Sequence, residues 1–193
     1  IAFVMVYVPI IPFCIKHFYH IITNGAVDIY KYFKHKEYNR CHFFGRIYMI
    51  TAYRNKVFGS GKTLDMTMLA RCVYNRYNGL SVWNEDKQAF VTQNIHIISN
   101  VELLDVPYTP FVSAEQMKNV EQEEDDITLF VFDEVGAIWN SRNYKDNIST
   151  ELLKRLLQVR KNKIGILCTA QRFKFVDALL RQITGSLFCV NKT

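Results

Sequence analysis

Gly59-Ser60-Gly61-Lys62-Thr63 is the stretch that decides the fold of this chain. It follows a run rich in β-branched and aromatic residues at 46–53, which is typical of a buried strand. Residues 62–77 then have helical spacing, which places one set of side chains toward the core: Leu64, Met68, Leu69, Cys72 and Val73. A strand, a glycine loop and a helix in this order are the context that a phosphate-binding loop requires.

Each residue type in this loop has a physical task. Gly59 and Gly61 lack a Cβ, so backbone N–H groups can turn toward phosphate oxygens, and the following helix points its positive end at the same place. Lys62 can reach the β- and γ-phosphates, and the Thr63 hydroxyl can bind Mg²⁺. The expected nucleotide-binding residues are Gly59, Ser60, Gly61, Lys62, Thr63 and Leu64.

One position departs from the full pattern G-x-x-x-x-G-K-[ST]. That pattern has glycine six residues before its lysine, where this chain has Lys56. The stretch 59–63 is intact, so the assignment as a phosphate loop is kept.

An apolar run at 127–132 ends in Asp133 and Glu134. A continuous apolar run is typical of a central parallel strand, and open α/β sheets hold ligands at the carboxyl ends of such strands. Asp133 would then hold Mg²⁺ through water, and Glu134 would act as general base on the attacking water. The alternative is an acidic strand end that simply faces solvent.

A second buried strand is expected at 163–170, followed directly by Gln171. A polar side chain at this place, beside the acidic strand, can sense the γ-phosphate or orient water. Thr169 is a weaker candidate for the same task. A plain strand-to-helix cap is the alternative interpretation.

Further segments follow the same order along the chain. They are Ser99-Asn100, 133–142 (DEVGAIWNSR), 158–161 (QVRK), 169–171 (TAQ) and 177–181 (DALLR). Together with the loop, they resemble the FtsK–HerA group of P-loop ATPases, and within it the zonular occludens toxin-like proteins, the assembly and export ATPases of filamentous phages. The resemblance covers about residues 47–190.

The resemblance implies an α/β fold of the P-loop NTPase type (RecA/ASCE-like), a mainly parallel sheet flanked by helices. It implies an ATP-driven motor on DNA, often membrane-bound and working as a homo-oligomeric ring, with ATP and Mg²⁺ as cofactors. By the same resemblance, Lys62 and Thr63 bind ATP and Mg²⁺, Asp133 and Glu134 form the metal and catalytic pair, and Gln171 is the sensor. A ring also needs an arginine from a neighbouring subunit, and the candidates are Arg142, Arg160 and Arg181.

Composition is consistent with this and does not decide it. A chain of 193 residues is one ordinary domain with an appendage, and a net charge of +6 suits nucleic acid or an anionic membrane. Five cysteines without a C-x-x-C pair argue against a disulfide framework, and Cys72 and Cys168 are expected in the core. The acidic run at 121–126 is expected to be a solvated loop. A helix at 150–161 carries basic residues that either contact DNA phosphates or face solvent.

The division of the chain is expected to be 1–45, an apolar and basic N-terminal segment, and 46–193, the ATPase domain. Residues 1–15 carry no charge, are too short to span a bilayer, and are followed by basic and aromatic residues. Three interpretations stay open: a membrane anchor, an apolar strand or hairpin, and a signal peptide, the last being least favoured. A membrane anchor would place the domain on the cytoplasmic face of a membrane, near other phage assembly proteins.

Two other functions remain open at this stage. A nucleotide kinase-like phosphotransferase would need an acceptor pocket and a lid, and no arginine-rich insertion of that kind is evident. A non-catalytic scaffold of a virion or secretion complex would keep the loop without turnover, and Lys56 is the one hint toward it.

Overall fold

The computed structural model describes residues 10–52, 59–113, 115–118, 120, 125–138, 158, 161–176 and 178–190. Its elements in chain order are α2 (Ile10–Lys34), η1 (Glu37–Asn39), β1 (Ile47–Ala52), α3 (Lys62–Tyr77), β2 (Leu80–Asn84), β3 (Ala89–Gln93), β4 (Ile95–Ser99), β5 (Thr109–Pro110), α4 (Glu115–Lys118), β6 (Ile127–Phe132), α5 (Val135–Ile138), β7 (Ile164–Ala170), η2 (Phe173–Phe175), α8 (Ala178–Ile183) and β8 (Thr184–Val190). Lys56, Arg142, Arg160 and nearly all of the helix expected at 150–161 lie outside the described residues.

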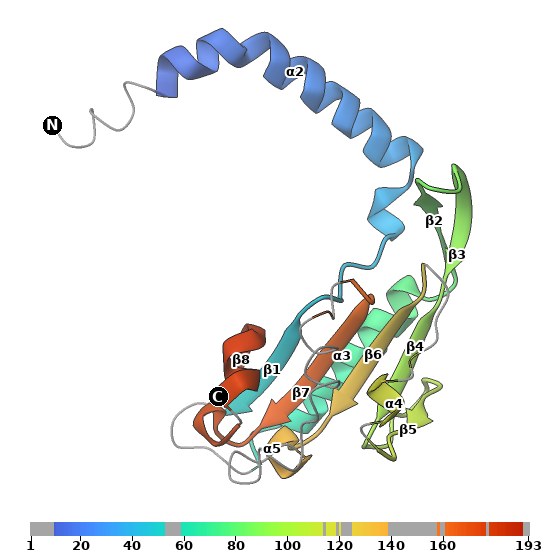
Figure 1. Cartoon of the computed structure of the whole chain (residues 1–193), viewed down its shortest axis with the longest axis vertical. Helices are drawn as coiled ribbons and strands as arrows, with labels where there is room; N and C mark the ends of the chain where they lie inside the picture. Colours follow the sequence, from blue (N-terminus) through green and yellow to red (C-terminus); the bar gives the residue numbers. More distant parts are fainter. Residues whose placement is uncertain are drawn as a thin grey trace, which may run out of the picture.

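The centre of the molecule is a six-stranded sheet with the order β5-β4-β6-β7-β1-β8, in which every neighbouring pair is parallel (Figure 1). The strand before the glycine loop, β1, and the strand before the acidic pair, β6, are both bonded to β7. The carboxyl ends of all three therefore meet at one edge of the sheet. The expected α/β fold with a mainly parallel sheet is confirmed.

Both faces of the sheet are covered, which explains the long apolar runs. Every residue of β6 and β7 is buried. One core lies between the sheet and α3, and includes Met66, Ala70 and Leu129. The other contains Phe130 and Phe132 with side chains from α4, α5 and α8. Strands buried on both sides have no alternating polar positions, so continuous hydrophobicity is what their sequence must show.

The inward face of α3 differs from the expected one. The helix has the predicted bounds, but its buried residues are Lys62, Met66, Ala70 and Val73. Leu64 and Met68 are 62% and 55% exposed, and Cys72 is exposed too. Lys62 is buried at the first helical position, and residues at intervals of three and four lie on its side of the helix. The buried face of α3 is therefore the face that contains Lys62, and apolar spacing alone did not identify it.

The four described cysteines are either buried or exposed. Cys41 and Cys168 are buried, whereas Cys72 and Cys189 are exposed, and all four are free thiols. The expectation for Cys168 is confirmed and that for Cys72 is wrong. Burial raises the pKa of Cys168 to about 12, so this thiol stays neutral and unreactive at physiological pH.

The acidic run before β6 is not wholly a solvated loop. Asp125 and Asp126 are 8% and 4% exposed, while 121–124 lie outside the described residues. Asp125 accepts hydrogen bonds from Asn84 Nδ2 at 2.5 Å and from Lys163 Nζ at 3.0 Å. Asp126 accepts from the backbone N–H of Asn94 at 2.9 Å. Both partners of Asp125 are distant in sequence, so composition of the run alone could not reveal the burial.

We expect Asp125 to make folding stability sensitive to acid. Burial alone would raise its pKa, but the bonds from Asn84 and Lys163 and the nearby positive charges outweigh burial and hold the pKa below its usual range. A carboxylate with a depressed pKa stabilises the fold above the unfolded pKa of about 3.9, and this contribution is lost as pH falls through the folded pKa. Asp125→Asn should cost about 2 kcal/mol at neutral pH. The difference in unfolding free energy between wild type and Asp125→Asn, measured by urea unfolding, should become smaller below about pH 4. A difference that stays constant down to about pH 2.5 would contradict the assignment.

Two smaller features complete the fold. β2 and β3 form an antiparallel hairpin that is separate from the main sheet. β5 is a two-residue strand, Thr109–Pro110, at the edge of the main sheet. Gln116 in α4 accepts hydrogen bonds from the backbone N–H groups of Val112 and Ser113, the reach-back of a capping box.

The N-terminal segment contains a helix rather than a strand or hairpin over its described part. α2 begins at Ile10, so Pro12 falls in the first turn, where proline removes no helical hydrogen bond. None of the described helices combines the length and the hydropathy that crossing a membrane requires. The boundary between 1–45 and 46–193 stays a prediction.

Candidate nucleotide site

The glycine loop has the backbone that its sequence predicts. Gly59 and Gly61 have φ of 63° and 84°, a region in which side chains other than hydrogen are strained. Gly61 is the N-cap of α3, so the helix begins directly at Lys62. Ser60 and Lys62 are buried, and Lys62 Nζ donates to Ser60 Oγ at 3.3 Å. The loop thereby places an ammonium group beside the positive end of a helix, where anions bind.

The loop and the acidic strand meet at Asp133. The hydroxyl of Thr63 donates to both carboxylate oxygens of Asp133 at 3.0 Å, across 70 positions of sequence. The hydroxyl of Thr169, near the end of β7, donates to Oδ1 of the same carboxylate at 2.5 Å. The carboxylate of Asp133, the first residue after β6, is thus held between the hydroxyl of Thr63 in α3 and the hydroxyl of Thr169 in β7.

Glu134 is held in an unusual backbone conformation. Its φ is 50°, which is uncommon for a residue with a side chain and costs conformational energy. Its backbone N–H donates to Thr169 Oγ1 at 2.9 Å, and its Oε1 accepts from Gln171 Nε2 at 3.0 Å. Because Thr169 bonds both acidic residues, and Gln171 bonds one, β7 sets the orientation of the pair.

The side chain of Leu64 is exposed, so a part in binding nucleotide would fall to its backbone. Six of the other predicted site residues fall into two connected groups. Ser60 and Lys62 form one, and Thr63, Asp133, Glu134 and Gln171 form the other. The groups are joined along the chain at Lys62 and Thr63.

Asn100 belongs to this site and was not assigned a role from the sequence. It follows β4, the strand bonded to β6 on the side opposite β7. Its Nδ2 donates to the carbonyl oxygen of Asp133 at 3.0 Å, and its Oδ1 accepts from the backbone N–H of Asp133 at 2.8 Å. This two-point bond fixes the peptide groups around Asp133. The sequence showed Ser99-Asn100 as one of the segments that carry the resemblance, but without the strand order it gave no sign that Asn100 contacts Asp133.

For the ATP hydrolysis that the resemblance implies, we expect Asn100→Ala to lower the rate about 10- to 100-fold, as removal of a group that orients a metal ligand commonly does. Both bonds to Asp133 would be lost, and unfolding free energy should fall by about 1–2 kcal/mol. Asn100→Asp, which keeps the acceptor and loses the donor, should fall between. Turnover should be measured across a Mg²⁺ titration, beside Asn24→Ala on the distant α2. Wild-type turnover in Asn100→Ala would remove Asn100 from the site.

The donor set at this place suits magnesium. Thr63 and Asp133 offer a hydroxyl and a carboxylate, the hard oxygen ligands that Mg²⁺ prefers. Among the described residues, no three His, Cys, Asp or Glu side chains gather as a metal cage. Magnesium commonly binds through one or two protein oxygens plus substrate phosphates and water, so a two-ligand site fits it.

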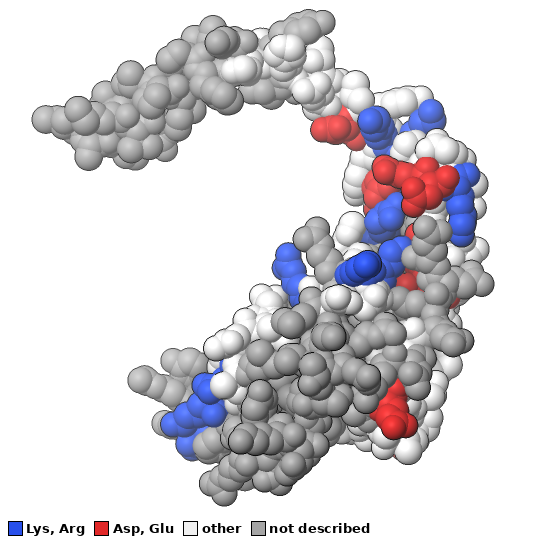
Figure 2. Space-filling view, viewed as in Figure 1, with Lys and Arg blue, Asp and Glu red and all other residues white. Residues whose placement is uncertain are grey.

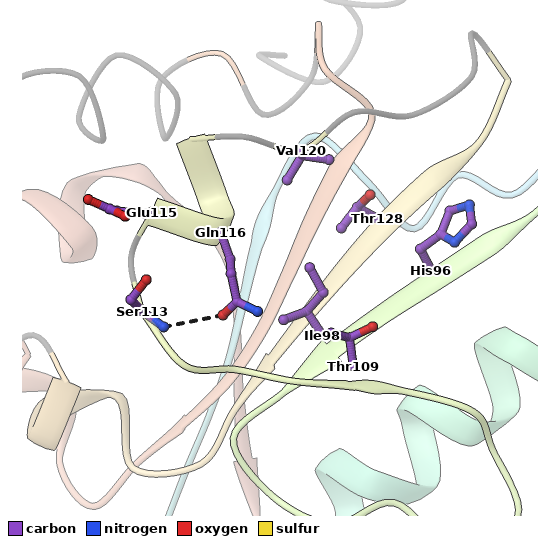
Figure 3. A pocket seen from close by; sticks show the side chains of 8 residues that line it. All are labelled: His96, Ile98, Thr109, Ser113, Glu115, Gln116, Val120 and Thr128. Carbon is purple, nitrogen blue, oxygen red and sulfur yellow. Dashed lines mark hydrogen bonds between the residues drawn. The ribbon is translucent and has the colours of Figure 1, made fainter.

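A separate pocket of about 470 Å³ lies among α4, β4, β5 and β6 (Figure 3). Its lining includes His96, Thr109, Gln116 and Thr128, and none of the predicted site residues. The ring of His96 is paired with Asp126 at 3.0 Å, and Gln116 caps α4. The contacts of His96 and Gln116 are thus explained by the fold that they stabilise.

Comparison with solved structures agrees with the fold. The chain is similar to the N-terminal domain of zonular occludens toxin from Neisseria meningitidis, with a TM-score of 0.55 and 21% identity over 78% of each chain. Looser overlaps include the genome packaging NTPase B204 of Sulfolobus turreted icosahedral virus 2, with a TM-score of 0.45, 12% identity, and coverage of 77% of this chain and 76% of that one. PCH-2 of C. elegans gives a TM-score of 0.42 and 17% identity, over 76% of this chain and 36% of that one.

No protein-family model and no curated protein sequence matches this chain. The similarity to the zonular occludens toxin domain therefore supports the fold and nothing beyond the fold. The chain has the fold of P-loop NTPases, a parallel sheet with a glycine loop after one strand and an acidic pair after another.

Proposed function

We propose that this chain is a Mg²⁺-dependent ATP hydrolase. The observation that carries the proposal is the bond from Thr63 Oγ1 to both oxygens of Asp133 at 3.0 Å. It brings the end of the phosphate loop and the acidic strand to one place, as binding of a metal–triphosphate complex requires.

Each group then has a defined part in hydrolysis. Lys62 and the backbone of 59–64 bind the β- and γ-phosphates, and Thr63 with Asp133 would hold Mg²⁺, which neutralises charge on the transferred group. Glu134 accepts the proton of a water whose oxygen bonds to the γ-phosphorus while the bond to the β–γ bridging oxygen breaks. Gln171 holds the Glu134 carboxylate, and from the same place it can contact the γ-phosphate.

We further propose that hydrolysis drives movement of DNA, in phage assembly and export or in genome packaging. The sequence resemblance to zonular occludens toxin-like ATPases of the FtsK–HerA group supports this, as does the net charge of +6. The work would be done by a homo-oligomeric ring. Of the arginines considered for action on a neighbouring subunit, Arg181 is the described one, and its Nε is buried without a hydrogen-bond partner among the residues that the structure describes.

An ATPase assay with and without single- and double-stranded DNA tests the proposal. Phosphate release that depends on Mg²⁺ and rises with DNA is the expected result. Phosphate transfer to a nucleoside acceptor would instead identify a kinase-like enzyme. Failure to bind Mg-ATP would identify a non-catalytic scaffold.

A further inference from the structure

The α2 helix projects from the body of the protein and is attached at one end (Figure 1). Near that end, the ring of His35 stacks on Trp83 of the β2–β3 hairpin with centroids 4.6 Å apart. Asn39 Nδ2 donates to the carbonyl oxygen of Ser81 at 3.3 Å, and Arg40 donates to that of Trp83. The rest of α2 curves away from the central sheet. The segment directly after α2 thus contacts the hairpin, while most of the helix lies off the domain.

One side of α2 is a stripe of exposed apolar side chains, which we call the apolar stripe. It consists of Phe18, Ile22, Ile29 and Phe33, which are 63%, 53%, 61% and 66% exposed. The intervals of four, seven and four residues keep all four on one face of a helix. Gly25, Ala26 and Tyr32 extend the same face, whereas His20, Asn24, Lys31 and Lys34 lie on the other side. A soluble helix normally turns such a face to a core.

A second copy of this helix is a poor occupant for the stripe. The alternation of four and three residues through Phe18, Ile22, Gly25, Ile29 and Tyr32 follows a heptad repeat, but Gly25 offers no side chain to pack. The positions that flank this seam are Ala26, Asp28 and Phe33. They provide no pairs of opposite charge to set a partner helix in register, and they make the apolar face wider than a coiled-coil seam.

An anionic lipid surface matches the helix better. Within α2, three basic residues, Lys16, Lys31 and Lys34, stand against one acidic residue, Asp28. Figure 2 shows basic and acidic side chains where α2 meets the hairpin. Lys31, Lys34 and Lys36 stand at the attached end, on the polar side or just after it. Aromatic and lysine side chains beside an apolar stripe are typical of helices that lie in the membrane interface.

We propose that α2 lies in the interface of an anionic bilayer with its apolar stripe among the acyl chains. Phe18, Ile22, Ile29 and Phe33 would be buried in lipid, and the lysines would remain among the headgroups. The inference deepens the proposed function by giving the ATPase domain a peripheral attachment to a membrane. It does not depend on hydrolysis, because the helix and the nucleotide site share no residues.

Co-sedimentation with vesicles, without nucleotide, tests this placement. The full chain is mixed with vesicles of phosphatidylcholine alone or of phosphatidylcholine with phosphatidylglycerol. We expect binding to the anionic vesicles, weakened by salt. Phe18→Ser with Ile29→Ser should lower the partition coefficient at least about tenfold. Val27→Ser is the matched control, since Val27 is 48% exposed on the opposite side of the same helix, and it should bind as wild type does.

Other outcomes would overturn the proposal. These are absence of wild-type binding to anionic vesicles, or equal binding by the double variant and the Val27→Ser control. Analytical ultracentrifugation without lipid tests the main alternative, a dimer of this chain. If the wild type is a dimer that Phe18→Ser with Ile29→Ser breaks, and if it does not bind vesicles, the apolar stripe belongs to a second copy. Circular dichroism checks that the variants fold. ATPase turnover of the same preparations, assayed separately, shows whether the hydrolase proposal stands when this one fails.

Discussion

Replacing Lys62 by alanine is expected to reduce ATP hydrolysis by at least about a hundredfold, the loss that follows removal of one charge-stabilising donor from a preorganised site. The ammonium group of Lys62 is buried beside Ser60, with its Nζ 3.3 Å from Ser60 Oγ. In that place it opposes the charge of the β- and γ-phosphates, in the ground state and more strongly as charge moves in the transition state. Nucleotide affinity should fall as well, because ground-state contacts are lost.

The fold should survive this change. Alanine is the best helix former, and Lys62 is the first residue of α3, where a smaller side chain meets no packing conflict. Circular dichroism and urea unfolding of Lys62→Ala should therefore resemble wild type. Lys87→Ala, in the turn of the β2–β3 hairpin, is the matched control for loss of a lysine and should keep wild-type turnover. Hydrolysis by Lys62→Ala at the wild-type rate would refute the phosphate-loop assignment.

The centre of the sheet could be predicted because β6 and β7 are buried on both faces. The run 127–132 and the stretch 164–170 contain hardly any polar residue, and such runs suit only interior parallel strands. The glycine loop could also be predicted, because the positive φ at Gly59 and Gly61 favours glycine. Local sequence therefore predicted the elements that local physics determines.

The order of the strands and the contacts between distant residues could not be predicted from the sequence. Asn100 contacts Asp133 only because β4 lies beside β6, and Asp125 is buried only because Asn84 and Lys163 meet it. On α3, several sets of residues have helical spacing, and the buried set includes a charged residue, Lys62. Apolar spacing cannot identify a face that contains a lysine. These features depend on pairs far apart in the chain, which a single sequence does not display.

Glu134→Gln should nearly abolish hydrolysis while ATP binding is retained. The substitution keeps the size of the side chain and its Oε1, so the bond from Gln171 Nε2, 3.0 Å in the structure, can remain. The backbone bond from Glu134 to Thr169 is also unaffected, so the left-handed conformation at φ 50° keeps its support. What the variant loses is the negative charge and the basicity that remove a proton from water. Loss of a general base costs about a hundredfold to ten-thousandfold in rate.

Two measurements on this variant separate binding from chemistry. Equilibrium binding of Mg-ATP to Glu134→Gln should be close to wild type, whereas single-turnover hydrolysis should be slower by the factor above. Glu85→Gln, an exposed glutamate in the turn of the β2–β3 hairpin, is the matched control and should hydrolyse normally. If Glu134→Gln turned over like wild type, the proton acceptor would be another group. If it lost ATP binding instead, Glu134 would serve the ground-state complex, and its bond to Gln171 would be structural rather than preparatory to catalysis.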